Sequence, residues 1–420
     1  MDVRGTDPPA SGVTAVTEPF DPFVPGFTAD PYPYYQRYRS IDPVHFGRPA
    51  APGAEGTWFL FRHDDVAAAL RDARFVREVR TALPDLPRPE LPDPYRPFWQ
   101  MASKWILFRD PPDHTRLRAL VTKAFTPRIV QALAPRIAEI AEQLIDEVEP
   151  NGSIDLIRDY AYPLPVIVIA ELLGVPHQDR IRFRDWSVAL AAAIDLRTSP
   201  DVYGRASEAT REMTALLRDI VAERRVEPRD DLVSALIAAE SGDGALDEEE
   251  LIAMCVLLLV AGHETTVNLI GNGVLALLRH PEQLELLRSR PDLYDPAVEE
   301  LLRFDSSVQF TFRFAREEIE LRGRTIPRGH QVGLVIGSAN RDPEHFPEPD
   351  RLDVTRTQLR HLAFGMGIHF CLGAPLARLE ARLALETLLR RLPGLRLVDE
   401  PLRWRKGIGF RGLEALELRW

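Results

Sequence analysis

Cys371 is the residue whose surroundings best suit metal-ligand chemistry, and it is one of two cysteines among 420 residues. Gly365, Gly367 and Gly373 lie around it, and glycine permits backbone conformations that turn amide hydrogens toward a sulfur atom. Pro375 and the regularly spaced leucines after it predict a helix, which places Cys371 at a helix N-terminus. Because the helix dipole favours a thiolate there, we predict a thiolate ligand. The alternative is a buried structural cysteine in a glycine turn.

A second set of reactive groups lies in the segment Ala261-Gly262-His263-Glu264-Thr265-Thr266. Acidic residues at 247–250 and apolar periodicity up to Leu278 predict a buried helix of roughly 30 residues around it. Glycine and back-bonding threonines weaken such a helix, and conflicts of this kind tend to mark functional sites. Glu264 beside the Thr265 hydroxyl could pass protons to a reacting group, whereas a threonine-rich kink is the structural alternative. For His263 we assign no role beyond that of a satisfied histidine.

A basic pair follows the proline-led helix start at residues 110–113. His114 and Arg118 are four residues apart and therefore share one helical face. Such a pair suits an anionic group such as a carboxylate, although a solvated basic face is the commoner meaning of an isolated His/Arg pair.

Phe364, Gly367, Cys371 and Gly373 together match the haem-binding signature Phe-x-x-Gly-x-x-x-Cys-x-Gly. On these residues the chain resembles the cytochrome P450 family, and the resemblance extends from Asp30 to Trp420. It implies a mainly α fold with small β-sheets, shaped as a triangular prism, with haem b between the long central helix and the cysteine loop. Cys371 would be the axial ligand of the haem iron, as in this family's general scheme.

The resemblance also implies roles for other residues. Ala261 and Gly262 would leave room for haem and O₂, Thr265 would hydrogen-bond the oxygen, and Glu264 would relay protons from solvent. Haem contacts would come from the cysteine loop and from basic residues that bind the propionates: His114, Arg118, Arg313, His361, Phe364, Gly365, His369 and Gly373.

A structural cluster is expected on the cysteine side of the haem. Glu300 and Arg303 lie three apart on a predicted helix and can pair. In the family such a pair binds a later arginine, for which Arg351 matches the usual Pro-x-Arg-Phe pattern. Leu352 replaces the phenylalanine here, which makes this third member the weakest match.

Composition bounds the class of protein. A net charge of −11 argues against a nucleic-acid binder, and two cysteines cannot build a disulfide framework, which suits the cytoplasm. Residues 1–20 lack the apolar core of a signal peptide, and the apolar run 251–262 is shorter than the ~20 residues of a membrane span. We therefore predict a cytoplasmic monomer without a membrane anchor.

The elements that must position these groups can be outlined from the sequence. A loose leader is expected over 1–28, followed by a single catalytic domain over 29–420. Helices are predicted after Asp30, from His63 and through most of 128–240, and strands at 44–46, 57–61, 395–398 and 415–420. The proline-rich stretch 81–98 predicts a long loop, either a cover over the substrate pocket or a solvated connector.

The resemblance implies a haem-thiolate monooxygenase that inserts one atom of O₂ into an apolar organic substrate by hydroxylation or epoxidation. Because no flavin-binding segment is visible, electrons from NAD(P)H are expected to arrive through a ferredoxin and its reductase. A peroxide-driven peroxygenase or a non-catalytic haem protein would have no need of Glu264 and Thr265, and a cysteine hydrolase would not arrange its histidines in this loop.

The form Ala-Gly-His-Glu-Thr-Thr resembles bacterial P450s of secondary metabolism that tailor polyketides and macrolides, with a fatty-acid or terpene hydroxylase as the alternative. The substrate could be a free small molecule or one carried on a carrier protein. The segments 81–105 and 183–198 are expected near the pocket, together with six apolar side chains that suggest an apolar, partly aromatic lining: Leu257, Val260, Val308, Phe310, Phe312 and Phe410.

Overall fold

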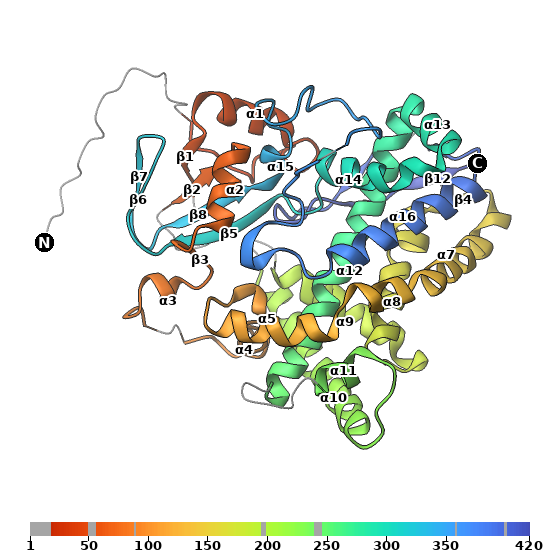
Figure 1. The fold of residues 1–420 in the computed structure, drawn as a ribbon, viewed down its shortest axis with the longest axis horizontal. Coiled ribbons are helices and arrows are strands. Elements are labelled where there is room, and N and C mark those ends of the chain that lie inside the picture. The colour runs from red at the N-terminus through yellow and green to blue at the C-terminus, as the bar shows by residue number, and fades with distance from the viewer. Residues whose placement is uncertain are drawn as a thin grey trace, which may run out of the picture.

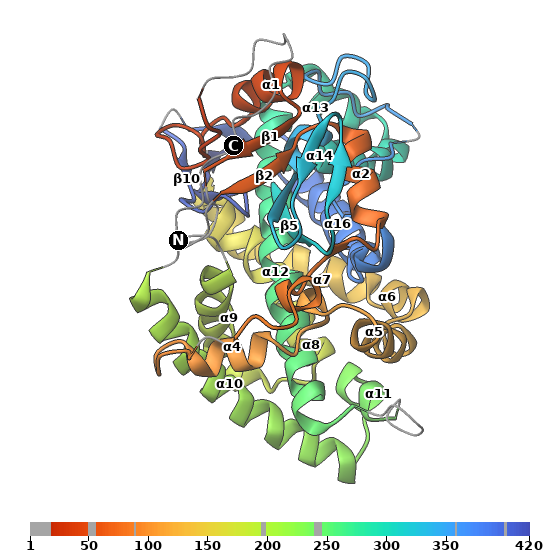
Figure 2. The ribbon, with the colours of Figure 1, turned by 90° about the vertical axis from the view of Figure 1, so that its left-hand side faces the viewer.

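The structure is a computed structural model that describes residues 18–48, 56–87, 90–194, 199–238, 246–357, 359–398 and 401–420. Its central element is α12 (Glu248–Arg279), a 32-residue helix around which the other helices gather (Figures 1 and 2). The Asp247 carboxylate accepts the Glu250 N–H, and the Glu250 carboxylate accepts the Asp247 N–H. This capping box fixes the start of the helix where the acidic run predicts it.

Among the described residues, α12 is the helix long and apolar enough to cross a membrane. However, 72% of its most apolar stretch is buried inside the structure, so its apolar surface is covered by the protein itself. Its length and hydropathy are therefore those expected of a core helix.

Among the described residues, seven helices, joined by parts of shorter ones, pack around α12 or against one another in one large hydrophobic core. Their buried faces follow from apolar residues at helical spacing, as in Ile137, Ile140 and Leu144. They are α5 (Asp113–Ala124), α7 (Ala134–Val148), α8 (Pro163–Leu172), α9 (Arg180–Ile194), α10 (Pro200–Val226), α14 (Tyr294–Phe304) and α16 (Ala374–Arg391).

The shorter helices lie mostly toward the N-terminal half or in connections. They are α1 (Tyr32–Ile41), α2 (His63–Arg71), α3 (Val79–Ala82), α4 (Arg96–Ala102), α6 (Pro127–Ala132), α11 (Leu232–Ala238), α13 (Pro281–Ser289) and α15 (Ile336–Ala339).

A five-stranded sheet lies to one side of the helices (Figure 1), in the order β1 (Val44–Gly47), β2 (Thr57–Leu60), β8 (Gln331–Val335), β5 (Phe310–Ala315) and β3 (Phe75–Val76). Strands β2 and β8 are parallel, and the other neighbours are antiparallel. Smaller sheets pair β4 (Ser153–Asp155), β12 (Glu417–Arg419) and β9 (Arg396–Leu397), then β10 (Arg403–Trp404) with β11 (Leu413–Ala415), and β6 (Ile319–Leu321) with β7 (Arg324–Ile326).

The predicted fold class, mainly α with small β-sheets, is confirmed, as are the strands near 44 and 57. The predicted leader of residues 1–28 is too long, because Phe20 and Phe27 are 1% and 2% exposed in an aromatic cluster with Tyr35. Residues 1–17 lie outside the described residues. The predicted loop 81–98 is shorter than expected, since α3 and α4 occupy its ends, and residues 88–89 are not described.

Candidate cofactor and catalytic site

Cys371 lies in the loop between the short 3₁₀ turn Gly367–His369 and α16. Gly365 and Gly367 have φ of +69° and +71°, so both use the left-handed conformation that the sequence predicts for this loop. A Cβ on Gly367 would also lie 2.5 Å from the Leu70 carbonyl oxygen, so the loop needs glycine there to pass close to α2. Gly373 is different, because its φ is −79° and it directly precedes α16.

The pKa of the Cys371 thiol is shifted by opposing effects. Burial raises it, while the amide hydrogens of Gly373 and Ala374 and the charges of Arg118 and Arg378 lower it. Burial outweighs these effects and the pKa of the thiol is raised, but the amides turn toward the sulfur as the helix N-terminus predicts and would stabilise a thiolate bound to a cation. Cys255 lacks such a setting: it is fully buried in α12, and burial raises its pKa to about 12.

His114 of α5 and His369 of the cysteine loop lie together, with ring centroids 4.3 Å apart. Both ring nitrogens of His114 and Nε2 of His369 are buried, and no described residue hydrogen-bonds them. Burial, followed by the nearby Arg313 and Arg77, lowers the pKa of His369 to about 2. Buried polar atoms rarely lack partners, so this pair indicates room for a ligand that accepts hydrogen bonds.

Two arginines, the buried Arg313 and the half-buried Arg77, stand beside this histidine pair. Arg313 on β5 and Arg77 after β3 each donate to the Thr311 hydroxyl and the Phe312 carbonyl oxygen, and neither pairs with a carboxylate among the described residues. Burial lowers the pKa of Arg77 to about 10 and that of Arg313 well below its ordinary value, with Arg77 a further cause for Arg313. Two such guanidinium groups call for an anion. Sequence reasoning found Arg313 and missed Arg77, whose position carries no motif.

Arg118 connects this basic cluster to the sulfur. Burial lowers its pKa, and the proximity of Cys371 raises it. The predicted set His114, Arg118, Arg313 and His369 therefore comes together from α5, β5 and the cysteine loop, on the same side as Cys371.

On α12, an exposed stripe interrupts a helix that is otherwise almost fully buried. Leu258, Ala261, Gly262 and Thr265 are the residues that remain accessible in its middle, at the i, i+3, i+4, i+7 spacing of one helical face. A Cβ added to Gly262 would meet no atom within 4 Å, so the helix faces open space there. The Thr265 hydroxyl donates to the Ala261 carbonyl oxygen at 2.9 Å, and the Thr265 carbonyl oxygen accepts from the Ser307 hydroxyl at 2.8 Å.

The stripe corrects two of the predicted pocket residues. Leu257 and Val260 are 6% and 3% exposed and belong to the hydrophobic core, so Leu258 is the residue one turn before Ala261 that faces the open side. Spacing alone could not fix the rotation of the helix, because apolar residues occur on every side of it.

Strand β5 supplies a similar correction. Phe310 is 4% exposed and packs against Phe27 and Tyr35, and Phe312 stacks on Phe310 at 6.3 Å, so both face the N-terminal aromatic cluster. Because side chains alternate along a strand, Arg313 and its neighbour Thr311 face the opposite way. The other two predicted residues, Val308 and Phe410, lie opposite each other in an isolated β-bridge. Within the predicted segments 81–105 and 183–198, residues 88–89 and 195–198 are not described.

Glu264 is 5% exposed, and its carboxylate Oε1 forms an ion pair with Arg405, which follows β10 near the C-terminus. Burial lowers the pKa of Arg405, which remains paired with the acid all the same. The pairing joins two positions far apart in sequence, and sequence reasoning missed Arg405 for that reason.

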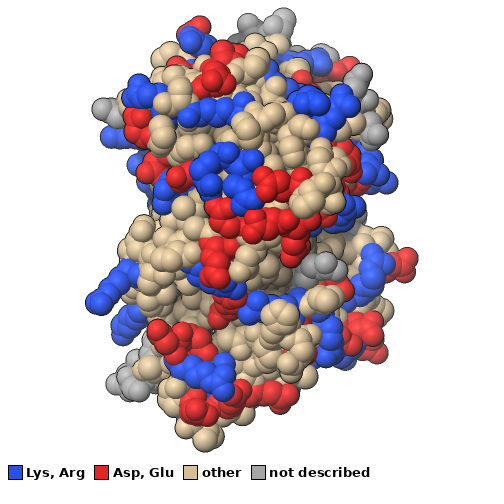
Figure 3. Space-filling view, turned by 90° about the vertical axis from the view of Figure 1, so that its right-hand side faces the viewer, with Lys and Arg blue, Asp and Glu red and all other residues tan. Residues whose placement is uncertain are grey.

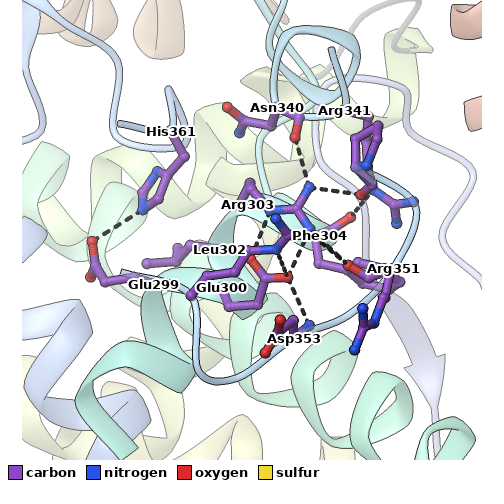
Figure 4. Close-up of polar contacts among 12 residues, drawn as sticks. Glu299, Glu300, Leu302, Arg303, Phe304, Asn340, Arg341, Arg351, Asp353 and His361 are labelled. Carbon is purple, nitrogen blue, oxygen red and sulfur yellow. Dashed lines mark hydrogen bonds and ion pairs between the residues drawn. The ribbon is translucent and has the colours of Figure 1, made fainter. Parts of the chain in front are cut away.

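The structural pair of Glu300 and Arg303 on α14 forms as predicted, with Nε to Oε2 at 2.7 Å and both side chains 0% exposed (Figure 4). Arg303 also donates to the carbonyl oxygens of Asn340 and Pro349. The cluster is buried and its hydrogen bonds are complete within the polypeptide, so it holds the segment before the cysteine loop without any cofactor.

The predicted third member, Arg351, is wrong. Its side chain is exposed and pairs with Glu348, while its carbonyl oxygen accepts from Arg303 (Figure 4). Arg356 is the side chain that reaches Glu300, with Nε to Oε1 at 3.3 Å. The chain folds back between these two positions, which places the later arginine over the acid.

His361 is also wrong as a predicted propionate ligand. Its Nε2 lies 3.2 Å from the Glu299 carboxylate, and its Nδ1 accepts the Ala363 N–H at 3.2 Å, so neither nitrogen is available. Glu299 binds Arg378 as well, and these partners outweigh burial to hold the pKa of Glu299 at about 2. Arg378 in turn lies over the Phe364 ring at 4.5 Å.

The arrangement as a whole fits a haem. The Cys371 sulfur, with amide hydrogens turned toward it, would bind the haem iron. The basic side chains without ion-pair partners would bind the propionates, and the open stripe on α12 would face the side of the haem where O₂ binds. The unpartnered His114 and His369 nitrogens are the strongest sign, because a buried histidine pair without hydrogen bonds is costly unless a ligand completes it.

Comparisons with known proteins agree with this site. Residues 183–393 match the model of the family described as Cytochrome P450. The polyketide biosynthesis cytochrome P450 PksS of Bacillus subtilis is 41% identical over 401 residues, 94% of this chain and 97% of that protein. The mycinamicin IV hydroxylase/epoxidase of Micromonospora griseorubida is 44% identical over 391 residues, 92% and 94%. The crystal structure of P450BioI with an acyl carrier protein ligated to hexadec-9Z-enoic acid has a TM-score of 0.87 at 40% identity, covering 94% and 99%.

Proposed function

The chain belongs to the cytochrome P450 family and is a haem monooxygenase, and we propose that it hydroxylates or epoxidises an apolar secondary metabolite. One atom of O₂ enters the substrate, and the other leaves as water after two electrons and two protons are supplied. The cofactor would be haem b, whose iron the Cys371 sulfur would bind. The observation that carries the proposal is the set of unpartnered basic side chains beside the Cys371 sulfur.

The propionates of the haem would be held by His114, Arg118, Arg313 and His369, with Arg77 as a fifth partner. His114 and Arg313 are buried and the other three side chains are half-buried. Burial is the largest cause that lowers the pKa values of His369, Arg77 and Arg313, and the charge of Asp110 opposes it only in part at the two arginines. Two carboxylates would supply a counter-charge.

When bound, haem supplies the chemistry of O₂ activation, and the residues of α12 supply protons and space. Thr265 lies on the open stripe, where its hydroxyl can release the Ala261 carbonyl oxygen and donate to a ligand instead. Glu264 lies next to it on the buried side and holds a negative charge beside Arg405. We assign Glu264 the transfer of protons toward Thr265, because an acid next to a hydroxyl gives a short ordered path.

Electrons must come from redox partners in this family, and we propose a ferredoxin and its NAD(P)H-dependent reductase. Arg378 and Arg382 near the cysteine loop pair with Glu299 and Asp295. The face that carries α7 and the end of α16 mixes acidic and basic side chains (Figure 3), as Arg391 pairs with Glu142 there. A ferredoxin would therefore compete with local acids for these arginines, and its binding should weaken with salt.

The substrate is proposed to be a polyketide-like or macrolide-like molecule, either free or attached to a carrier protein. The relatives named for polyketide and mycinamicin chemistry support the class, and the acyl-carrier complex of P450BioI supports a tethered form as the second candidate. The open stripe of α12 offers Leu258 and Ala261 to the substrate, together with the paired Val308 and Phe410. These side chains are apolar, as the proposed substrate is.

We expect the enzyme to act as a monomer in the cytoplasm, where Cys255 and Cys371 stay reduced. The function is tested by titrating the ferric holoprotein with a panel of macrolactones, terpenes, fatty acids and flat aromatics while following the Soret band. A high-spin shift with macrolactones supports the proposal. A shift with fatty acids or terpenes alone would replace the substrate class, and a protein without a haem spectrum would overturn the function.

A further inference from the structure

His263 stands directly before the acid of the proposed relay and is completely buried, with 0% of its surface exposed. Burial, opposed by a contact with the Leu259 carbonyl oxygen and assisted by the charge of Arg405, lowers its pKa to about 4. The ring is therefore neutral at neutral pH and carries one N–H and one lone pair. A neutral buried histidine needs a donor for one nitrogen and an acceptor for the other.

The two ring nitrogens face groups on two different helices. Nδ1 lies 2.7 Å from the Ser187 hydroxyl of α9 and 3.3 Å from the Leu259 carbonyl oxygen one turn back on α12, and Nε2 lies 3.2 Å from the Glu264 carboxylate oxygen Oε2. A hydroxyl can donate or accept, so the Ser187 contact is satisfied whichever ring nitrogen carries the N–H.

The surroundings make this connection specific. Ser187 is 0% exposed and has buried apolar neighbours on α9, such as Phe183 and Leu190. The Tyr162 ring packs edge-on against His263 at 5.4 Å and limits its rotation. A buried polar pair in such a setting defines one relative position of α9 and α12, which run past each other in Figure 2.

The Glu264 carboxylate is bound unequally at its two oxygens. Oε1 is paired with Arg405, whereas no described residue completes a hydrogen bond to Oε2, although His263 Nε2 lies 3.2 Å from it. Oε2 is therefore the oxygen available to take up a proton, and a small movement of His263 would change its environment.

We propose that His263 is a positioning residue that joins Ser187 of α9 to Glu264, so that the position of α9 sets the orientation of the relay acid. The inference rests on the proposed function, because it gives Glu264 the relay role. A group that contacts α9, such as a bound substrate, would then influence proton transfer without touching Glu264.

The test separates the two contacts of His263 in the full-length holoprotein. H263N keeps a polar atom near Nδ1 and loses the one near Nε2, H263Q does the reverse, and H263L removes both. S187A breaks the link from the other helix and leaves α12 unchanged. His280 supplies the matched control H280N, because it ends the same helix and its Nδ1 also lies near the carbonyl oxygen four residues back, at 2.8 Å.

Two readouts are needed, and neither requires the natural substrate. Hydrogen exchange of α9 reports the link to Ser187, and the solvent isotope effect on NADPH oxidation, with a surrogate ferredoxin and reductase and no added substrate, reports proton transfer. We expect exchange of α9 to rise about tenfold in H263L and S187A and to recover in H263N. NADPH oxidation should slow about tenfold in H263L with a larger isotope effect, and recover in H263Q.

Wild-type rates of exchange and oxidation in both H263L and S187A would overturn the proposal. Equal losses in H263L, H263N, H263Q and H280N would also overturn it, because they would show general loosening of α12. If H263L does not fold, the hydrogen exchange of α9 in S187A by itself decides whether the link to α9 exists. Failure of the proposed function would look different: the wild-type protein itself would lack the carbon monoxide difference spectrum of a thiolate-bound haem.

Discussion

The cluster around Glu300 and the cluster around His114 are both buried and both rich in charge, but their hydrogen bonds differ. Arg303 and Glu300 bind each other, and Arg303 also binds two backbone carbonyl oxygens, so this cluster is complete within the chain. His114 and His369 have buried nitrogens without partners. The difference separates a polar cluster that stabilises the fold from one that a ligand must complete.

The largest effect should come from the sulfur itself. C371A should abolish monooxygenase turnover and the thiolate signature in the carbon monoxide difference spectrum, because Cys371 is the described cysteine that lies beside Arg118 and Arg378. C255A is the matched control and should keep both, since Cys255 is a buried core residue of α12. Monooxygenase turnover by C371A would show that the Cys371 sulfur is not part of the active site.

Breaking the complete cluster should cost stability with or without haem. R303A leaves Glu300 buried with Arg356 as its remaining charged partner, and we expect a loss of about 3–5 kcal/mol in unfolding free energy by urea titration. R351A, on an exposed side chain, should change it by less than about 0.5 kcal/mol. Equal losses in the two variants would restore Arg351 as the third member of the cluster.

Thr265 tests the proton path on the open face of α12. T265A should lower the fraction of electrons recovered in product about tenfold or more, with peroxide released instead, because the hydroxyl next to Glu264 is lost. T266A is the control, since the Thr266 hydroxyl bonds back to the Gly262 carbonyl oxygen and contacts the buried Glu380 carboxyl group, and Thr266 itself is buried. Coupled turnover in T265A would contradict the relay.

The incomplete cluster should behave in the opposite way from the complete one. H114F removes two unpartnered nitrogens, so the haem-free protein should keep its unfolding free energy to within about 1 kcal/mol. Haem should nevertheless dissociate faster, by about tenfold, in transfer to apomyoglobin. Stable haem retention in H114F would show that His114 does not hold the cofactor.

A separate effect concerns Glu380 of α16, a buried acid that neither cluster uses. Burial raises its pKa to about 8 from an ordinary 4.5. The folded chain therefore holds a proton that the unfolded chain releases, and stability falls as the pH rises from about 4.5 to 8. E380Q should remove that decline, at most about 1.4 kcal/mol per pH unit, in urea titrations at pH 5 and 8. Parallel pH profiles of the unfolding free energy in E380Q and the wild type would contradict a raised pKa for Glu380.

The sequence predicts the parts of this molecule that are local. The glycine pattern around Cys371, the capped helix 247–278 and the Glu300–Arg303 pair each depend on residues close in the chain, and each forms. His114 and Arg118 are also found from helical spacing. These features are specified by backbone conformation and by one turn of helix.

The parts that fail depend on tertiary packing. Arg405 and Arg356 bind acids more than 50 residues away, which no spacing predicts. Phe310 was expected in the pocket, but strand alternation places it on the other face. Leu257 and Val260 were expected to line the pocket instead of Leu258, because α12 is apolar all around and its rotation is set by neighbouring helices.

The central claim is that the unpartnered basic side chains and Cys371 form one haem-thiolate site. The most direct measurement is the carbon monoxide difference spectrum of the purified, reduced wild-type protein, recorded beside C371A. The account predicts a thiolate-ligated haem in the wild type and its loss in C371A. A wild-type spectrum typical of histidine-ligated haem, or one unchanged by C371A, would contradict it.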